Sequence, residues 1–170
     1  LSQKFQTISE HLKQFIVESS NEELIPIIDE SRPLIRTGDL TPWMTSKKTQ
    51  SIEYSHINNM VADSKFEVEL CQHLERMGSS GKIFSWAKND HLGFKIWYVF
   101  KGEIKTYYPD FIIKINEENF VIIETKGIKK DQDEFKWNAM KEWVIAINNR
   151  DFGNWKFETV LTKDDFNKIL

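Results

Sequence analysis

Apolar side chains recur every three to four positions in three stretches of the chain, a spacing typical of amphipathic helices. The first stretch lies within residues 1–38, where two prolines limit the later part to short helical pieces. The second begins at Ser64, where an S-x-x-E pattern predicts a capping box, and we expect it to stop at Gly78. The third covers residues 133–149. The apolar positions that define the three are Phe5, Ile8, Leu12 and Phe15, then Phe66, Leu70, Leu74 and Met77, then Met140, Trp143, Val144 and Ile147.

Between and after these helices the pattern changes to that of strands. Residues 83–86 and 95–101 predict two strands, and residues 110–115 and 120–124 predict two more. The polar turn 116–119 is short enough to join the last two as a hairpin. A final strand is expected at 155–161, with a terminal helix after Thr162. This order predicts an α/β fold in which helices flank a mixed sheet on both faces.

The chain has 170 residues, 40% hydrophobic and 29% charged, which suits one globular domain with an accessory segment. We expect residues 1–60 to form a helical N-terminal extension or covering arm and residues 61–170 to form the core. A single cysteine, Cys71, excludes an internal disulfide framework and a multi-thiolate zinc site. The single cysteine also fits a reducing, cytoplasmic setting, and the sequence carries no signal peptide or membrane-length apolar run. Because it begins with Leu, we expect a fragment of a longer polypeptide.

Charge and motif content exclude several functions. The formal net charge of −3 gives no support to nucleic-acid binding through bulk electrostatics, so any such affinity must come from local clusters. The sequence has no glycine-rich phosphate loop. Its four histidines are scattered without the spacing of metal ligands or of a nucleophile with its base.

Two carboxylates occupy matching ends of the predicted hairpin. Asp110 opens the first strand and Glu124 closes the second, so antiparallel pairing brings them to one end of the sheet. Close carboxylates repel one another unless a cation joins them, and Mg²⁺ binds through one or two carboxylates plus phosphate. Lys126 lies on the same face as Glu124 and would orient water or neutralise charge on a phosphate. The alternative is that both acids are strand-end residues in solvent.

Other charged side chains are candidates for the same site. Glu67 is either a third acid that reaches the metal or only the capping glutamate of its helix. Lys136, on the third helix, either faces a phosphate or extends along the apolar stripe. Lys126, Lys129 and Lys130 form a local basic patch that would contact a DNA backbone.

At Pro109-Asp110 and Glu124-Thr125-Lys126 the sequence resembles the PD-(D/E)XK nuclease superfamily. It is similar in particular to the C-terminal endonuclease domain of the restriction subunit of type III restriction-modification enzymes, over roughly residues 37–155. The matching stretches are Thr37-Gly38-Asp39, Pro42-Trp43, Ser55-His56-Ile57-Asn58, Val61-Ala62-Asp63-Ser64, Lys88-Asn89-Asp90, Leu92-Gly93-Phe94, Tyr108-Pro109-Asp110-Phe111-Ile112, Glu124-Thr125-Lys126-Gly127, Lys136, Ala139, Trp143-Val144 and Asn148.

The resemblance implies a Mg²⁺-dependent endonuclease, with Mn²⁺ as a substitute ion. Asp110, Glu124 and the backbone carbonyl of Thr125 would bind the metal, Lys126 would be the catalytic lysine, and Glu67 would take a helix-borne acidic position. Double-stranded DNA would be the substrate. A helicase-like translocase domain of the same polypeptide and a DNA methyltransferase subunit would be the partners, and ATP and S-adenosylmethionine would act only through them. Phe66 departs from the family pattern, which often has Trp there.

Two other functions remain open on the sequence. One is a non-catalytic DNA-binding or docking module that retains the nuclease fold. The other is a stand-alone DNA repair nuclease, which shares the chemistry but not the partners.

Overall fold

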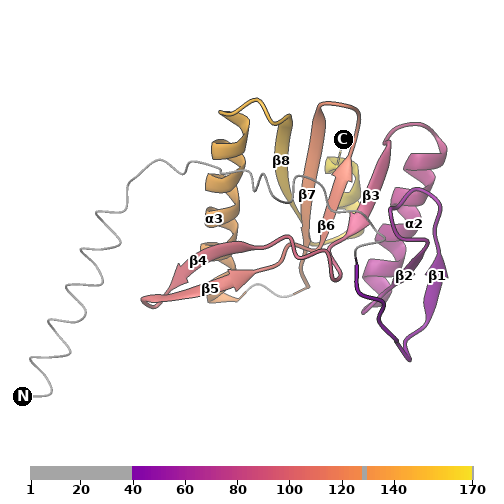
Figure 1. Cartoon of the computed structure of the whole chain (residues 1–170), viewed down its shortest axis with the longest axis horizontal. Coiled ribbons are helices and arrows are strands. Elements are labelled where there is room, and N and C mark those ends of the chain that lie inside the picture. Colours follow the sequence, from indigo (N-terminus) through magenta and orange to yellow (C-terminus); the bar gives the residue numbers. More distant parts are fainter. Residues whose placement is uncertain (1–39, 128–129, 170) are drawn as a thin grey trace, which may run out of the picture.

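The structure is a computed structural model, and it describes residues 40–127 and 130–169. Within them lie two α-helices, one 3₁₀ helix and eight strands, arranged around a sheet (Figure 1). In chain order these elements are β1 (Thr49–Ser51), β2 (Asn59–Val61), α2 (Lys65–Ser79), β3 (Ser85–Lys88), β4 (Ile96–Phe100), β5 (Glu103–Tyr107), β6 (Phe111–Lys114), β7 (Asn119–Thr125), α3 (Asp131–Asn148), β8 (Asn154–Val160) and η2 (Lys163–Lys168).

The main sheet has the strand order β3-β6-β7-β8. β6 pairs antiparallel with both β3 and β7, whereas β7 and β8 are parallel and are joined through α3. The expected mixed sheet is therefore confirmed. The apolar run Val121-Ile122-Ile123 lies in the central strand β7, where all three side chains are at most 1% exposed, because both faces of the sheet are covered.

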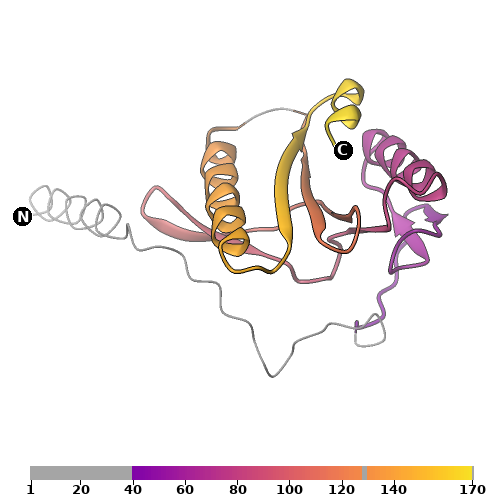
Figure 2. The same ribbon diagram turned by 90° about the horizontal axis from the view of Figure 1, so that it is seen from above.

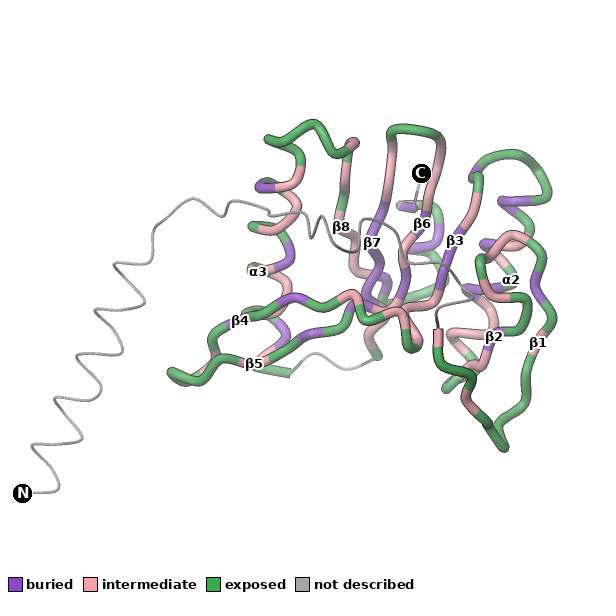
Figure 3. Tube along the Cα trace, viewed as in Figure 1, coloured by how far each residue is buried: buried purple, intermediate pink, exposed green. Residues whose placement is uncertain are grey.

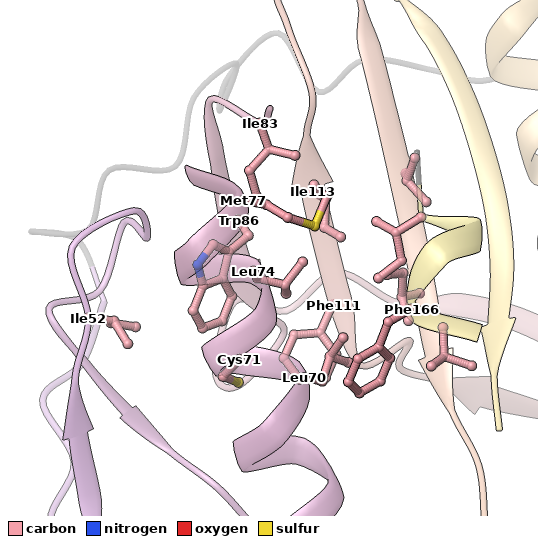
Figure 4. Close-up of a cluster of buried hydrophobic side chains, with 14 of the residues drawn as sticks. Ile52, Leu70, Cys71, Leu74, Met77, Ile83, Trp86, Phe111, Ile113 and Phe166 are labelled. Carbon is pink, nitrogen blue, oxygen red and sulfur yellow. The ribbon is translucent and has the colours of Figure 1, made fainter. Parts of the chain in front are cut away.

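Each face of the sheet has its own hydrophobic core, and Figure 2 shows α3 on one side of the main sheet and α2 on the other. On one face, α2 and η2 pack on alternate residues of β3, β6 and β7, and Figure 4 shows Leu74, Phe111 and Phe166 in this cluster. On the other face, α3 packs with β4, β5 and Ile122 of β7. This layering confirms helices on both sides of the sheet.

Helix α2 begins as its sequence predicts, because the Ser64 hydroxyl accepts a hydrogen bond from the Glu67 amide at 3.1 Å. The predicted stop at Gly78 is wrong, since the helix runs to Ser79. Gly78 serves another purpose: a Cβ there would lie 2.3 Å from Cγ of Tyr54. The glycine lets the segment after β1 lie directly against the helix.

Strands β4 and β5 pair only with each other and form a two-stranded ribbon beside the main sheet. The predicted strand at 95–101 is confirmed as β4, but the sequence pattern missed β5. The chain reverses at Lys101 and Gly102, which both have positive φ values, of 52° and 74°. A tight turn of this kind joins adjacent antiparallel strands without splaying them.

The segment before α2 forms a second small sheet of β1 and β2, from which Ile52 and Met60 belong to the core on the α2 side. The helices expected within residues 1–38 lie outside the described residues. No helix of the described part of the chain combines the length and apolarity needed to cross a membrane.

Candidate active site

The predicted hairpin is present and brings the two candidate acids to the same end of its two strands. β6 and β7 pair with Phe111 opposite Ile123, and the Asp110 amide donates to the Ile123 carbonyl at 3.1 Å. The turn closes around Asn116, whose side-chain oxygen accepts from the amides of Glu118 and Asn119. Asp110 therefore directly precedes β6 at the end of the hairpin where Glu124 lies next to the last residue of β7.

Asp110 is held by the residue that follows its partner acid. Its Oδ2 accepts hydrogen bonds from the backbone amide of Thr125 at 2.7 Å and from the Thr125 hydroxyl at 2.5 Å. Burial raises the pKa of Asp110, although both hydrogen bonds oppose the shift, and the charge of Glu67 raises it further. Two donors thus fix the direction of this carboxylate.

Glu124 is more deeply buried, with 5% of its surface exposed. Its Oε2 accepts a hydrogen bond from the hydroxyl of Tyr107 at 2.9 Å. Burial, and then the charge of Asp110, raise the pKa of Glu124 to about 8. The effect of Asp110 shows that the two carboxylates are electrostatic neighbours, and such a pair favours a bound cation.

Lys126 is anchored by a residue that sequence reasoning missed. Its Nζ lies 3.0 Å from Oδ1 of Asp133, a fully buried carboxylate in the first turn of α3. The Nζ of Lys136 lies 3.5 Å from the same oxygen and 5.6 Å from the ring centre of Tyr107. Both ammonium groups lower the pKa of Glu124, so they share its environment. One buried aspartate therefore gathers two cations beside the acid pair.

Asp133 and Tyr107 had weak signals in the sequence. Asp133 occupies the third position of α3, where an acid that accepts from the backbone amide of the N-cap residue is common, and its Oδ2 accepts from the amide of Lys130, the N-cap, at 2.7 Å. Tyr107 ends a strand that the pattern did not reveal. Neither position identifies its long-range partner, because Lys126 and Glu124 reach these residues only through the packing of α3 and β5.

Asp133→Asn is expected to lower the free energy of unfolding by about 2 kcal/mol at pH 7, because it leaves two lysines around an uncharged buried group. Burial would raise the pKa of Asp133, but the Lys130 amide and the Lys126 ammonium outweigh it and lower the pKa. The ionised Asp133 therefore contributes fully to the free energy of unfolding at pH values above the ordinary pKa of an aspartate. This contribution is lost as the pH falls through the lowered pKa. Urea unfolding of the parent and of Asp133→Asn measures this loss of unfolding free energy at pH 7 and at pH 3. Asp131→Asn, an exposed change in the same helical turn, is the control, and an equal loss there would contradict the role of burial.

Glu67 makes the contacts of a capping residue and also pairs with Lys88. Its Oε2 accepts from the Asp63 amide at 3.2 Å and lies 2.9 Å from the Lys88 Nζ. Lys88 is bound in addition by Asp63 at 2.8 Å. Burial lowers the pKa of Lys88, but these carboxylates outweigh it and raise the pKa. Glu67 therefore influences Asp110 through its charge while its own oxygens are held by Asp63 and Lys88.

Within residues 40–127 and 130–169, no three side chains of Asp, Glu, His or Cys are grouped so as to hold a metal ion. The predicted ligands Asp110 and Glu124 lie together as a pair, while the Glu67 carboxylate is bonded to Asp63 and Lys88. Oxygen donors of this kind suit Mg²⁺, which binds through few protein ligands and completes its shell with water and phosphate. Lys130 is exposed at the start of α3, and Lys129 lies outside the described residues.

Comparison with family models, curated proteins and solved structures finds no match to this chain. Its class is that of a mixed α/β protein, as defined by its own sheet and helices.

Proposed function

We propose that the chain is a Mg²⁺-dependent endonuclease domain that hydrolyses DNA phosphodiester bonds. One observation supports this most strongly: the buried carboxylate of Glu124 and the partly buried carboxylate of Asp110 lie at the same end of an antiparallel strand pair, close enough to interact electrostatically. Burial raises the pKa values of both carboxyl groups above their ordinary range, and a bound cation would favour their charged forms.

Each residue of the site has a role in this proposal. Asp110 and Glu124 would hold the ion, with the backbone carbonyl of Thr125 as a further ligand. The ion would polarise the scissile phosphate and lower the pKa of a bound water. Lys126, fixed by Asp133, would present its ammonium to the charge that develops on the phosphate. The second cation, Lys136, would bind a neighbouring phosphate of the strand.

The finer assignment rests on the resemblance together with this geometry. A PD-(D/E)XK core would carry its acids on a strand hairpin and its lysine two residues beyond the second acid, as in β6 and β7 here. The domain would then be the cleavage part of a type III restriction subunit in the cytoplasm. A translocase domain and a methyltransferase subunit would deliver the DNA.

Calorimetric titration with Mn²⁺ tests the site directly. The full chain should bind Mn²⁺ at Asp110 and Glu124, and Glu124→Ala should weaken binding by at least about tenfold, because only one carboxylate remains. Glu117→Ala, an exposed change in the β6–β7 turn, should leave binding unchanged. No Mn²⁺ binding by the full chain, even with duplex DNA present, would contradict the proposal.

A second candidate function is a non-catalytic docking module that retains the fold. It is favoured by the hydrogen bonds that Thr125 and Tyr107 already donate to the two carboxylates, and by the pairing of Lys126 with Asp133. Such a module would bind duplex DNA with the same affinity in Mg²⁺ and in a chelator. The nuclease would bind more tightly with the ion, since the ion joins the acids to the phosphate.

A further inference from the structure

The β4–β5 ribbon has one buried face and one open face. Ile96 and Tyr98 of β4 and Tyr107 of β5 point into the core beneath α3, where each is at most 6% exposed. Alternate residues must point away from that core. Figure 3 shows this alternation of buried and exposed positions along β4, while β5 is buried only at its end, at Tyr107.

The open face carries large apolar side chains. Trp97 is 63% exposed, Val99 43% and Ile104 78%, and Tyr108, just after β5, is 54% exposed. Val99 lies directly opposite Ile104 in the ribbon, and Trp97 lies opposite Thr106, so the side chains form one continuous stripe. A contiguous exposed apolar stripe of this kind marks an interaction surface.

Lysines lie along the ribbon on both of its faces. Lys95 is on the open face, whereas Lys105 lies opposite Tyr98, with its Nζ 5.2 Å from the ring centre of Phe100 on the face toward α3. Residues 95–108 hold three lysines and one glutamate, although the whole chain has a net charge of −3. The Nζ of Lys95 lies 5.3 Å from the ring centre of Trp97, and Lys101 occupies the exposed turn at the tip. The glutamate, Glu103, lies 3.5 Å from Lys105. The ribbon is thus a basic part of an acidic chain, and its charge suits a polyanion.

The ribbon leads directly into the candidate active site. Tyr107 turns inward and donates to Glu124, Tyr108 turns outward, and Pro109 and Asp110 follow at once. In Figure 1 the two strands extend from the base of the main sheet past the lower part of α3. The base of the open face, at Tyr108, is therefore two residues from Asp110 in the chain.

We propose that the open face of the β4–β5 ribbon binds the double-stranded DNA that the site cleaves. This inference rests on the proposed function and adds a surface to it. A two-stranded ribbon fits the major groove of DNA, and five residues extend over roughly 16 Å. Lys95 and Lys101 contact phosphates, while Trp97, Val99 and Ile104 pack on sugars and base edges. A second copy of the chain fits less well, because pairing two ribbons would bring lysines together.

Duplex binding by the full chain tests this surface. Fluorescence anisotropy with a labelled 20-base-pair duplex, in Ca²⁺ to separate binding from cleavage, should show Ile104→Ser weakening affinity by on the order of tenfold. Ile145→Ser is the matched control, since Ile145 is 61% exposed on α3. When the logarithm of the binding constant is plotted against the logarithm of the salt concentration, Lys101→Gln should reduce the slope by about 1. Lys82→Gln, an exposed change beyond α2, should leave the slope unchanged.

The outcomes separate the surface from the chemistry. If the ribbon variants bind duplex as the parent does, or if the parent binds none at low salt, the ribbon inference is wrong. These binding results reject the ribbon inference whether or not the chain cleaves DNA. If binding depends on the ribbon but no Mg²⁺-dependent cleavage occurs, the inference stands and the nuclease proposal fails. If Ile104→Ser instead converts a dimer to a monomer in sedimentation, the stripe pairs two copies and the inference is overturned.

Discussion

Asp110→Asn is expected to lower Mg²⁺-dependent cleavage of duplex DNA by at least about a thousandfold. The ion contributes several kcal/mol to the reaction, and each 1.4 kcal/mol is a factor of about ten in rate. Asparagine keeps an oxygen that can accept from the Thr125 amide and hydroxyl, so the edge of the hairpin stays in place. Burial already raises the pKa of Asp110, so a neutral side chain there does not destabilise the fold.

The measurement is single-turnover cleavage of plasmid DNA by the full chain in Mg²⁺, with thermal unfolding of each variant as the check on folding. Asp164→Asn changes an exposed aspartate in η2 and should cleave as the parent does. Lys126→Met should also lose activity while it keeps Mn²⁺ binding, since the lysine is not a ligand in this proposal. Undiminished cleavage by Asp110→Asn would remove the acid pair from the mechanism.

Local patterns predicted the parts of the fold on which the site depends. The hairpin of β6 and β7 follows from two apolar runs and the turn at 116–119, and both are features of adjacent residues. Its register then places Asp110 and Glu124 at one edge without further information. Helix α2 begins at Ser64 for the same reason, because a cap is made by residues three positions apart.

The parts that could not be predicted depend on contacts between distant residues. The pattern predicted a stop at Gly78, but the glycine lies inside the helix because the Tyr54 ring packs against it. The ribbon separates from the main sheet because its inner face packs under α3, and no local pattern specifies that partner. Tyr107 and Asp133 complete the site only through that packing. Long-range contacts thus supplied the residues that hold Glu124 and Lys126 in place.

Glu124→Gln is expected to raise the free energy of unfolding of the metal-free protein by on the order of 3 kcal/mol at pH 7. Burial and the charge of Asp110 raise the pKa of Glu124 from 4.5 to about 8. Below pH 4.5 the carboxyl is protonated in both the folded and the unfolded chain, and it has no effect. Between pH 4.5 and 8 the unfolded chain releases the proton and the folded chain keeps it, so rising pH favours unfolding. Glutamine removes this penalty and can still accept the Tyr107 hydrogen bond.

Urea unfolding between pH 4 and pH 9, in a chelator, measures the difference. The two proteins should have equal stability at pH 4 and diverge as the pH rises, while Glu117→Gln, in the exposed turn, follows the parent throughout. A constant difference across this range would mean that glutamine acts by packing and not by charge.

Adding Mg²⁺ to the same urea experiment tests whether the destabilising carboxylate of Glu124 serves to bind a metal ion. A cation that binds only the folded protein stabilises it by mass action, and it binds the ionised form of Glu124. Mg²⁺ should therefore stabilise the parent above pH 7 and have little effect on Glu124→Gln, so the gap between them narrows as Mg²⁺ rises. A docking module would show the same pH-dependent gap with no response to Mg²⁺. The sensitivity of this gap to the ion thus distinguishes a metal site from a buried acid pair that serves only the fold.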